Sequence, residues 1–197
     1  MLKLLKLISY YSGKLVNFTE LGSKINLNKD TTKKYIQLIQ QLFLLKQLPA
    51  WHSNEYKRLV KTPKLHLTDT GLACAIRDID NNYLLNHPGE TGSLLETFVI
   101  NELQKQADWL DQDVNFYHYR DKDKVEVDCV IENSHGDCFA IEIKATATLN
   151  PKDFHGLKRF KDVAKNNFKI GILLYDGEQI TPFGENLFAV PIYALWS

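Results

Sequence analysis

Two neighbouring segments of the chain alternate between apolar and charged residues, as a pair of half-buried strands does. Residues 125–132 read Val-Glu-Val-Asp-Cys-Val-Ile-Glu, and residues 139–144 read Phe-Ala-Ile-Glu-Ile-Lys. The residues between them, 133–137, are Asn-Ser-His-Gly-Asp, a composition typical of a hairpin turn. Side chains of a strand point alternately to opposite faces. We therefore expect one sheet face to gather Asp128, Glu142 and Lys144, with Glu126 close by.

The predicted charged face has two chemical interpretations. Carboxylates in a partly buried place are costly unless cations neutralise them. Lys144 can neutralise one charge, and Asp128 and Glu142 offer the hard oxygen ligands that Mg²⁺ or Mn²⁺ takes. A metal held there would activate water and stabilise charge on phosphorus. The alternative is a solvated sheet face whose cross-strand ion pairs contribute roughly 0–1 kcal/mol each.

A helix is predicted before these strands, from Gly92 to about Ala107, and it supplies a further acid. Its apolar residues cover a wide arc of the helical wheel, and two glutamates, Glu96 and Glu102, fall inside that arc. Periodicity alone does not choose between them. Further strands are predicted at residues 114–119, 168–175 and 188–195, with a helix beginning near Pro151. This order predicts an α/β sandwich with a mixed sheet.

The first half of the chain has a different pattern. Apolar spacing predicts helices over residues 2–8, from residue 17 and from Asp30, the last carrying Leu42 and Phe43 on its apolar face. A strand, a basic stretch (52–61) and a second strand (63–69) follow. Three helices, a strand, a basic loop and a strand are the order of a winged helix-turn-helix.

Charge and composition separate the two halves. Residues 1–90 carry 13 Lys and Arg against 7 Asp and Glu, a balance of +6, and residues 91–197 carry 11 against 17, a balance of −6. We predict a winged-helix domain (1–80), a linker (81–90) rich in Asn, Pro and Gly, and a second domain (91–197). Basic residues of the first domain are candidates for nucleic-acid binding, against the alternative that they only confer solubility: Lys29, Lys33, Lys34, Arg58, Lys61 and Lys64.

The bulk composition excludes several classes of protein. No apolar run approaches the roughly 18 residues of a membrane helix. Three widely spaced cysteines form no C-x-x-C pair, which favours a reducing, cytoplasmic setting. No G-x-x-x-x-G-K-[ST] loop is present, so no ATP site is assigned to this chain.

An acid on a helix, then Asp128, then Glu142-Ile143-Lys144 after a hairpin, resembles the pattern of PD-(D/E)XK nucleases. Residues 92–103 and 119–128 resemble more narrowly the C-terminal region of prokaryotic ATPases of the AAA superfamily, which carries domain of unknown function 4143 after a winged helix. If the motif of the family is carried over position by position, Glu96 is the helix acid, and Asp128, Glu142 and Lys144 complete the catalytic set. Val127 stands where the motif has proline.

This resemblance implies an N-terminal winged helix followed by a restriction-endonuclease-like mixed-sheet domain. It implies Mg²⁺- or Mn²⁺-dependent cleavage of DNA, with Asp128, Glu142 and Glu96 holding metal, and an ATPase module as partner in cis or in trans. Two other interpretations stay open: a catalytically inactive DNA-binding or protein-docking tail of such an ATPase, and an assembly module in which the acidic half of one copy contacts the basic half of another.

Overall fold

The computed structural model describes residues 2–197, apart from the side chain of Val60, and divides them into two units. Unit 1 consists of the residues up to Leu48 together with Thr62–Asn101. Unit 2 consists of Pro49–Lys61 and Glu102–Ser197. Each unit is therefore built from two stretches of chain, and residues 49–61 are an excursion from the sequence of unit 1 into unit 2.

Unit 1 begins with three helices and a small sheet. The helices are α1 (Leu2–Ser9), α2 (Phe18–Ser23) and α3 (Lys29–Gln41). The antiparallel sheet has the order β1-β3-β2, made of β1 (Lys14–Leu15), β3 (Lys64–Leu67) and β2 (Leu45–Leu48). The helices bury their apolar faces against this sheet, and their shared core includes Ile8, Leu21, Ile36 and Leu65.

Local signals in the sequence account for the helix starts. The side chain of Asn17 accepts hydrogen bonds from the backbone N–H groups of Thr19 and Glu20 at the start of α2. The side chain of Asn28 accepts one from Thr31 at 2.8 Å at the start of α3. Each cap satisfies N–H groups that have no partner within the helix. The helix that we expected to open at Asn17 or Thr19 is thus confirmed.

The end of α3 differs from the prediction. The helix stops at Gln41, and Phe43 takes a positive φ of 58°. Leu42 and Phe43 are 61% and 83% exposed, so they leave the apolar face on which the periodicity placed them. The chain turns here because β2 begins at Leu45 and must reach its place beside β3.

Three further helices complete unit 1. They are α5 (Thr70–Arg77), α6 (Asn81–Asn86) and the first part of α7 (Pro88–Ala107). The stretch 81–90, predicted as a linker, therefore holds α6 and the first turn of α7. Asp80 caps α6 by accepting a hydrogen bond from Tyr83 N–H, so the Asp- and Asn-rich composition here encodes helix capping.

Unit 2 is a six-stranded mixed sheet with the order β4-β5-β6-β7-β9-β8. Its strands are β4 (Val114–Arg120), β5 (Glu126–Asn133), β6 (Cys138–Lys144), β7 (Phe168–Tyr175), β8 (Thr181–Gly184) and β9 (Leu187–Pro191). The pairs β6–β7 and β7–β9 are parallel, and the other pairs are antiparallel. The expected hairpin between β5 and β6 is confirmed, whereas β8 was not predicted.

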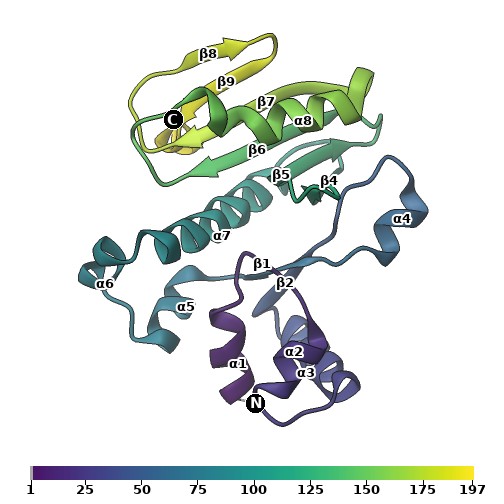
Figure 1. The fold of residues 1–197 in the computed structure, drawn as a ribbon, viewed down its shortest axis with the longest axis vertical. Coiled ribbons are helices and arrows are strands. Elements are labelled where there is room, and N and C mark those ends of the chain that lie inside the picture. Colours follow the sequence, from purple (N-terminus) through teal and green to yellow (C-terminus); the bar gives the residue numbers. More distant parts are fainter. Residues whose placement is uncertain (1) are drawn as a thin grey trace. The chain divides into compact units, whose positions relative to one another are not determined.

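One helix covers a face of this sheet. The turn η1 (Pro151–Phe154) leads into α8 (His155–Ala164), which packs against β5, β6 and β7 (Figure 1). The turn η2 (Lys165–Asn167) then leads into β7, and η3 (Ile192–Trp196) follows β9. Phe154, Leu157 and Phe160 are fully buried between the helix and the sheet. The α8-covered face is therefore the core of unit 2.

The excursion 49–61 contains the short helix α4 (Glu55–Val60). Trp51 is 3% exposed and packs edge-on against Phe160 at 4.9 Å between ring centroids, so it belongs to the core of unit 2. Trp51 N–H also donates to His118 O at 2.7 Å. None of the helices described between residues 2 and 197 combines the length and the apolar character needed to cross a lipid bilayer.

Candidate functional site

The strand β5 is irregular beside the predicted acid Asp128. Tyr117 of β4 pairs with Val130, but Tyr119 pairs with Val127, so β5 carries one more residue than β4 across this step. Val127 and Val130 consequently belong to the same buried cluster, although residues three apart in a regular strand face opposite ways. Strict alternation along residues 125–132 is therefore wrong, and a β-bulge sets the direction of Asp128.

Asp128 lies where β5 and β6 part. The ladder between the two strands runs from the Glu132–Cys138 pair to the Cys129–Ile141 pair and stops there. Asp128 Oδ2 then accepts a hydrogen bond from the backbone N–H of Ile143 at 2.9 Å. The carboxylate is thereby held against the backbone between Glu142 and Lys144, the two other residues of the predicted set.

Glu142 and Lys144 lie on the α8-covered face near the end of β6. Glu142 is 8% exposed, and its Oε1 pairs with Lys144 Nζ at 2.8 Å. Burial by itself would lower the pKa of Lys144, but the carboxylates of Glu142, Asp128 and Asp153 outweigh it and raise that pKa above its ordinary value. The lysine is therefore an ammonium ion at neutral pH, and its side chain is 36% exposed, within reach of a ligand.

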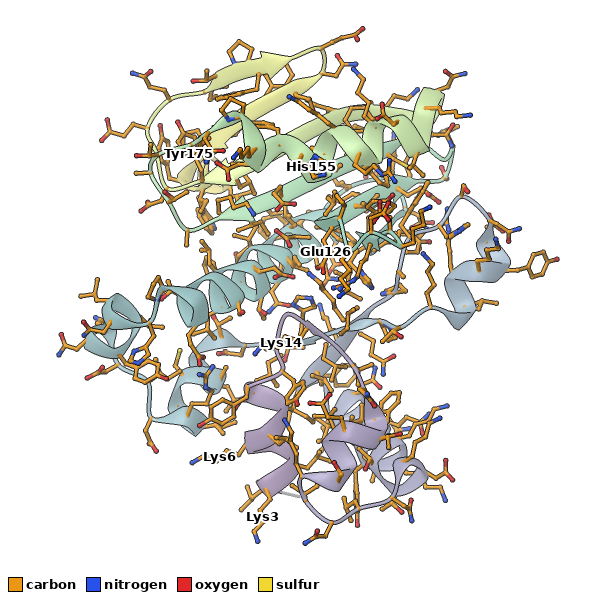
Figure 2. The ribbon with its side chains drawn as sticks, viewed as in Figure 1. Lys3, Lys6, Lys14, Glu126, His155 and Tyr175 are labelled. Atoms are coloured by element: carbon orange, nitrogen blue, oxygen red, sulfur yellow. The ribbon has the colours of Figure 1, made fainter. Side chains whose placement is uncertain are left out.

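The start of α8 lies beside Glu142. Gly156 is buried, and a Cβ built on it would lie 2.1 Å from Glu126 O and 3.5 Å from Glu142 Oε2. The absence of a side chain lets the helix approach the strands beside Glu142. Figure 2 labels Glu126 on β5, His155 at the start of α8 and Tyr175 at the end of β7, the elements that surround the group. Glu126 itself forms an ion pair with Arg120.

Glu96 is engaged in unit 1. It lies on α7, and its Oε1 pairs with Lys64 Nζ at 2.8 Å and lies 4.0 Å from His66 Nε2. The Lys64 side chain is 4% exposed and that of Glu96 14%. Thr97, the next residue on α7, is fully buried, with its hydroxyl 3.1 Å from His66 Nδ1. Glu96 thus balances a buried lysine. Glu102, the other glutamate on the predicted arc, pairs with Lys105.

The six basic residues predicted for nucleic-acid binding divide into two sets. Lys29, Lys33 and Lys34 are exposed on the first turns of α3. The other three are engaged inside their units: Lys64 with Glu96, Arg58 with Glu132, and Lys61 with Arg120 O at 3.4 Å. Lys64, Arg58 and Lys61 thus have intramolecular partners, and nucleic-acid binding by all six residues stays a prediction.

Glu132 is a largely buried, ion-paired acid, and its role was not predicted from the sequence. Arg58 donates to both of its carboxylate oxygens, at 2.8 and 2.9 Å, and Trp51 Nε1–H donates at 2.6 Å. Burial alone would raise the pKa of Glu132, but these hydrogen bonds outweigh it and hold the pKa below its ordinary value. Arg58 lies 74 residues away in sequence, so no local pattern could reveal the pair. Asp153, whose charge acts on Lys144, was also missed.

The donor set of this region suits a hard cation that keeps part of its own water. Over residues 2–197, no group of three or more His, Cys, Asp or Glu side chains is arranged to hold a metal by itself. Mg²⁺, however, is commonly bound through one or two carboxylates, with waters and substrate phosphates completing its shell. The carboxylates of Glu142, Asp128 and Asp153 all act on the ammonium of Lys144. Asp128 and Glu142 are the residues of this set that could bind such a cation.

Comparison with known proteins gives a family but no activity. The family model described as Domain of unknown function (DUF4143) matches residues 91–195, more than half of the chain, and Domain of unknown function (DUF8612) matches residues 1–83. The uncharacterized proteins Rv2008c of Mycobacterium tuberculosis and Mb2031c of Mycobacterium bovis are each 27% identical to it over 187 residues. The match covers 94% of this chain and 40% of those proteins. No solved structure matches significantly.

Proposed function

The chain belongs to the family of the Domain of unknown function (DUF4143), and on that premise we propose that unit 2 is a PD-(D/E)XK nuclease-like domain that hydrolyses phosphodiester bonds of DNA with Mg²⁺ or Mn²⁺. The observation that carries the proposal is the convergence of Asp128 and the Glu142–Lys144 pair where β5 and β6 part. A purely structural ion pair between Glu142 and Lys144, both on β6, does not require a further acid where two strands part.

The residues of the proposed site have distinct roles. Asp128 and Glu142 would hold the metal, which supplies a water of lowered pKa and charge stabilisation at phosphorus. Lys144, kept charged by its three acidic neighbours, donates hydrogen bonds to the attacking water or to the phosphate oxygens. Its charged state argues against a role as general base. Glu96 is left out of the proposed metal site because its carboxylate is already paired with Lys64 in unit 1.

The first half of the chain would hold the substrate. Its element order α1-β1-α2-α3-β2-α4-β3, in which α4 belongs to unit 2, and its three-stranded sheet fit a winged helix-turn-helix. The helix α3 presents Lys29, Lys33 and Lys34 to solvent. Lysines that neutralise phosphates release counterions, so affinity for duplex DNA should fall steeply as salt rises. Substitution of these three lysines with glutamine should flatten that salt dependence by roughly one unit of slope per lost contact.

Cleavage of linear duplex and single-stranded DNA in Mg²⁺ or Mn²⁺ tests the catalytic proposal. Lys144→Ala should lower the rate by about 10²–10³-fold, the usual cost of one transition-state hydrogen bond. Asp128→Asn keeps an oxygen for the Ile143 N–H but removes the charge, so it should abolish Mn²⁺ binding and leave the fold intact. Lys158→Ala, on the exposed side of α8, is the matched control and should cleave normally.

The outcomes of this assay separate the proposal from its rival. Metal-dependent cleavage that survives Lys144→Ala unchanged contradicts the assignment. Mn²⁺ binding that depends on Asp128, without cleavage of any DNA, favours the second candidate: an inactive nuclease-like scaffold that serves as the docking tail of a larger ATPase. One observation favours that candidate, namely the exposed apolar residues Leu38, Leu42 and Phe43 at the end of α3, which suit a protein contact.

A further inference from the structure

Helix α3 ends in a turn whose left-handed residue is a phenylalanine. Leu44 N–H donates to Ile39 O at 3.2 Å, and Phe43 N–H donates to Gln40 O at 2.9 Å. These are the two hydrogen bonds of a Schellman motif, whose left-handed position is usually a glycine and sometimes an asparagine. Here Phe43 takes that position with a φ of 58°, and Thr68 Oγ1 donates to its carbonyl at 2.7 Å. A bulky side chain is strained in this conformation.

The ring of Phe43 does not contribute to the core of unit 1. Phe43 is 83% exposed, Leu42 is 61% exposed and Leu38 is 44% exposed. Leu38 and Leu42 lie one helical turn apart, so the three residues form one apolar surface at the end of α3, which we call the α3 patch. A strained backbone position that holds an exposed aromatic ring indicates a contact with another molecule.

A second exposed apolar surface follows helix α7. Residues 108–113 read Asp-Trp-Leu-Asp-Gln-Asp, and we call them the Trp109 loop. Trp109 is 85% exposed and Leu110 is 59% exposed. Their backbone N–H groups donate to Gln106 O at 3.1 Å and to Ala107 O at 3.0 Å, so hydrogen bonds to the end of α7 hold the turn. Tryptophan is enriched among the residues that dominate protein interfaces, so this loop offers an anchor for a partner.

The two surfaces carry opposite charge. Residues 29–46, which form α3, the turn after it and the start of β2, carry four lysines against Asp30, a balance of +3. Asp69, beside Thr68, is engaged as the cap of α5. The Trp109 loop carries three aspartates and no basic residue, a balance of −3. Like charges would face each other if either surface packed on its own copy, whereas contact between the two surfaces pairs opposite charges.

We propose that the chain associates head to tail, with the Trp109 loop of one copy docked on the α3 patch of a second copy. Trp109 and Leu110 would pack on Phe43 and Leu42, and the aspartates of the loop would face the lysines of α3. Each copy offers one loop and one patch, so the contact is heterologous and either closes into a ring or extends. The patch and the loop lie outside the site at β5 and β6, so the association is independent of the proposed nuclease activity.

Two single variants each remove one half of the contact. Phe43→Asn removes the ring at a position where asparagine is better tolerated, so the melting temperature should stay the same or rise. Trp109→Ser removes the anchor of the loop at an 85% exposed position, so the fold should be kept. Each variant alone should associate at least about tenfold more weakly. Leu85→Ser, 82% exposed on α6 and outside both surfaces, is the matched control and should associate as the unchanged protein does.

Sedimentation velocity of the 197-residue chain, without DNA, measures the association. The sedimentation coefficient of the unchanged protein should rise with protein concentration at low salt, and the rise should be smaller at high salt because salt screens the charges. An equimolar mixture of the Phe43→Asn and Trp109→Ser variants should form a species of twice the mass and none larger. The first variant keeps its loop and the second keeps its patch, so the mixture restores a single contact.

Three outcomes would overturn the proposal. The first is a sedimentation coefficient that is independent of protein concentration up to about 1 mM, the weak end of specific affinities, which would leave the α3 patch to DNA or to another protein. The second is full association of either variant alone, which would indicate a symmetric contact through its remaining surface. The third is a mixture of the two variants that stays monomeric under conditions in which the unchanged protein associates.

Discussion

Replacing Glu132 with alanine should destabilise unit 2 strongly, because it leaves the buried donors of Arg58 and Trp51 without their acceptor. The side chains of Glu132 and Arg58 are both 13% exposed, and the carboxylate accepts two hydrogen bonds from Arg58 and one from Trp51. Removing one partner of a buried ion pair costs about 3–5 kcal/mol. Arg58 lies on the short helix α4 and can swing toward water, so we expect about 3 kcal/mol.

Thermal and urea unfolding, followed by circular dichroism, measure this loss. A domain of this size loses roughly 2–4 °C of melting temperature per kcal/mol, so Glu132→Ala should lower the melting temperature by about 6–12 °C. A double-mutant cycle with Arg58→Met should give a coupling of about 1.5–3 kcal/mol, the range for hydrogen bonds to charged groups. Glu185→Ala is the control, since Glu185 pairs with Lys161 while 86% exposed and should change stability by under about 0.5 kcal/mol.

The pH dependence gives an independent check with a definite sign. The folded state lowers the pKa of Glu132 below its ordinary value of 4.5. The stabilisation is therefore complete above the pKa of the unfolded chain and is lost as the pH falls through the folded value. The stability gap, which is the difference in free energy of unfolding between the unchanged protein and Glu132→Gln, should be constant above about pH 5.5. It should become smaller below about pH 4.5. A gap that is independent of pH, or a loss no larger than that of Glu185→Ala, refutes the reasoning.

Three further predictions test the fold around the two units. Gly156→Ala should lower the free energy of unfolding by about 2–3 kcal/mol, because its Cβ would lie 2.1 Å from Glu126 O and push α8 off the sheet. Gly89→Ala, whose Cβ would meet no atom within 4 Å, should show no such loss in urea unfolding. Glu96→Gln should cost about 2–4 kcal/mol by leaving buried Lys64 without its anion, and a melting temperature like that of the unchanged protein would contradict this role. Asn28→Ala should cost about 1 kcal/mol through loss of the α3 cap, measured by the urea midpoint, and an unchanged midpoint would contradict it.

Several elements could be predicted from the sequence, because local chemistry encodes them. Alternation between apolar and polar residues located β5 and β6, and an apolar run located β7. The turn residues 133–137 located the hairpin between β5 and β6. The candidate cap Asn17 located the start of α2, and helical periodicity located α3 from Asp30, one residue after its start at Lys29. The same local information placed Glu142 and Lys144 on one face of β6, because one strand's parity needs no knowledge of its neighbours.

The pairing of charged residues depends on long-range packing and could not be predicted from local sequence. The bulge in β5 follows from its pairing with β4 and redirects Asp128, which alternation could not indicate. Lys64 and Arg58 looked like surface charges, but distant carboxylates draw both into ion pairs. A charged side chain gains its buried partner through chain segments dozens of residues apart, so its role depends on the packing of those segments and leaves no trace in local sequence.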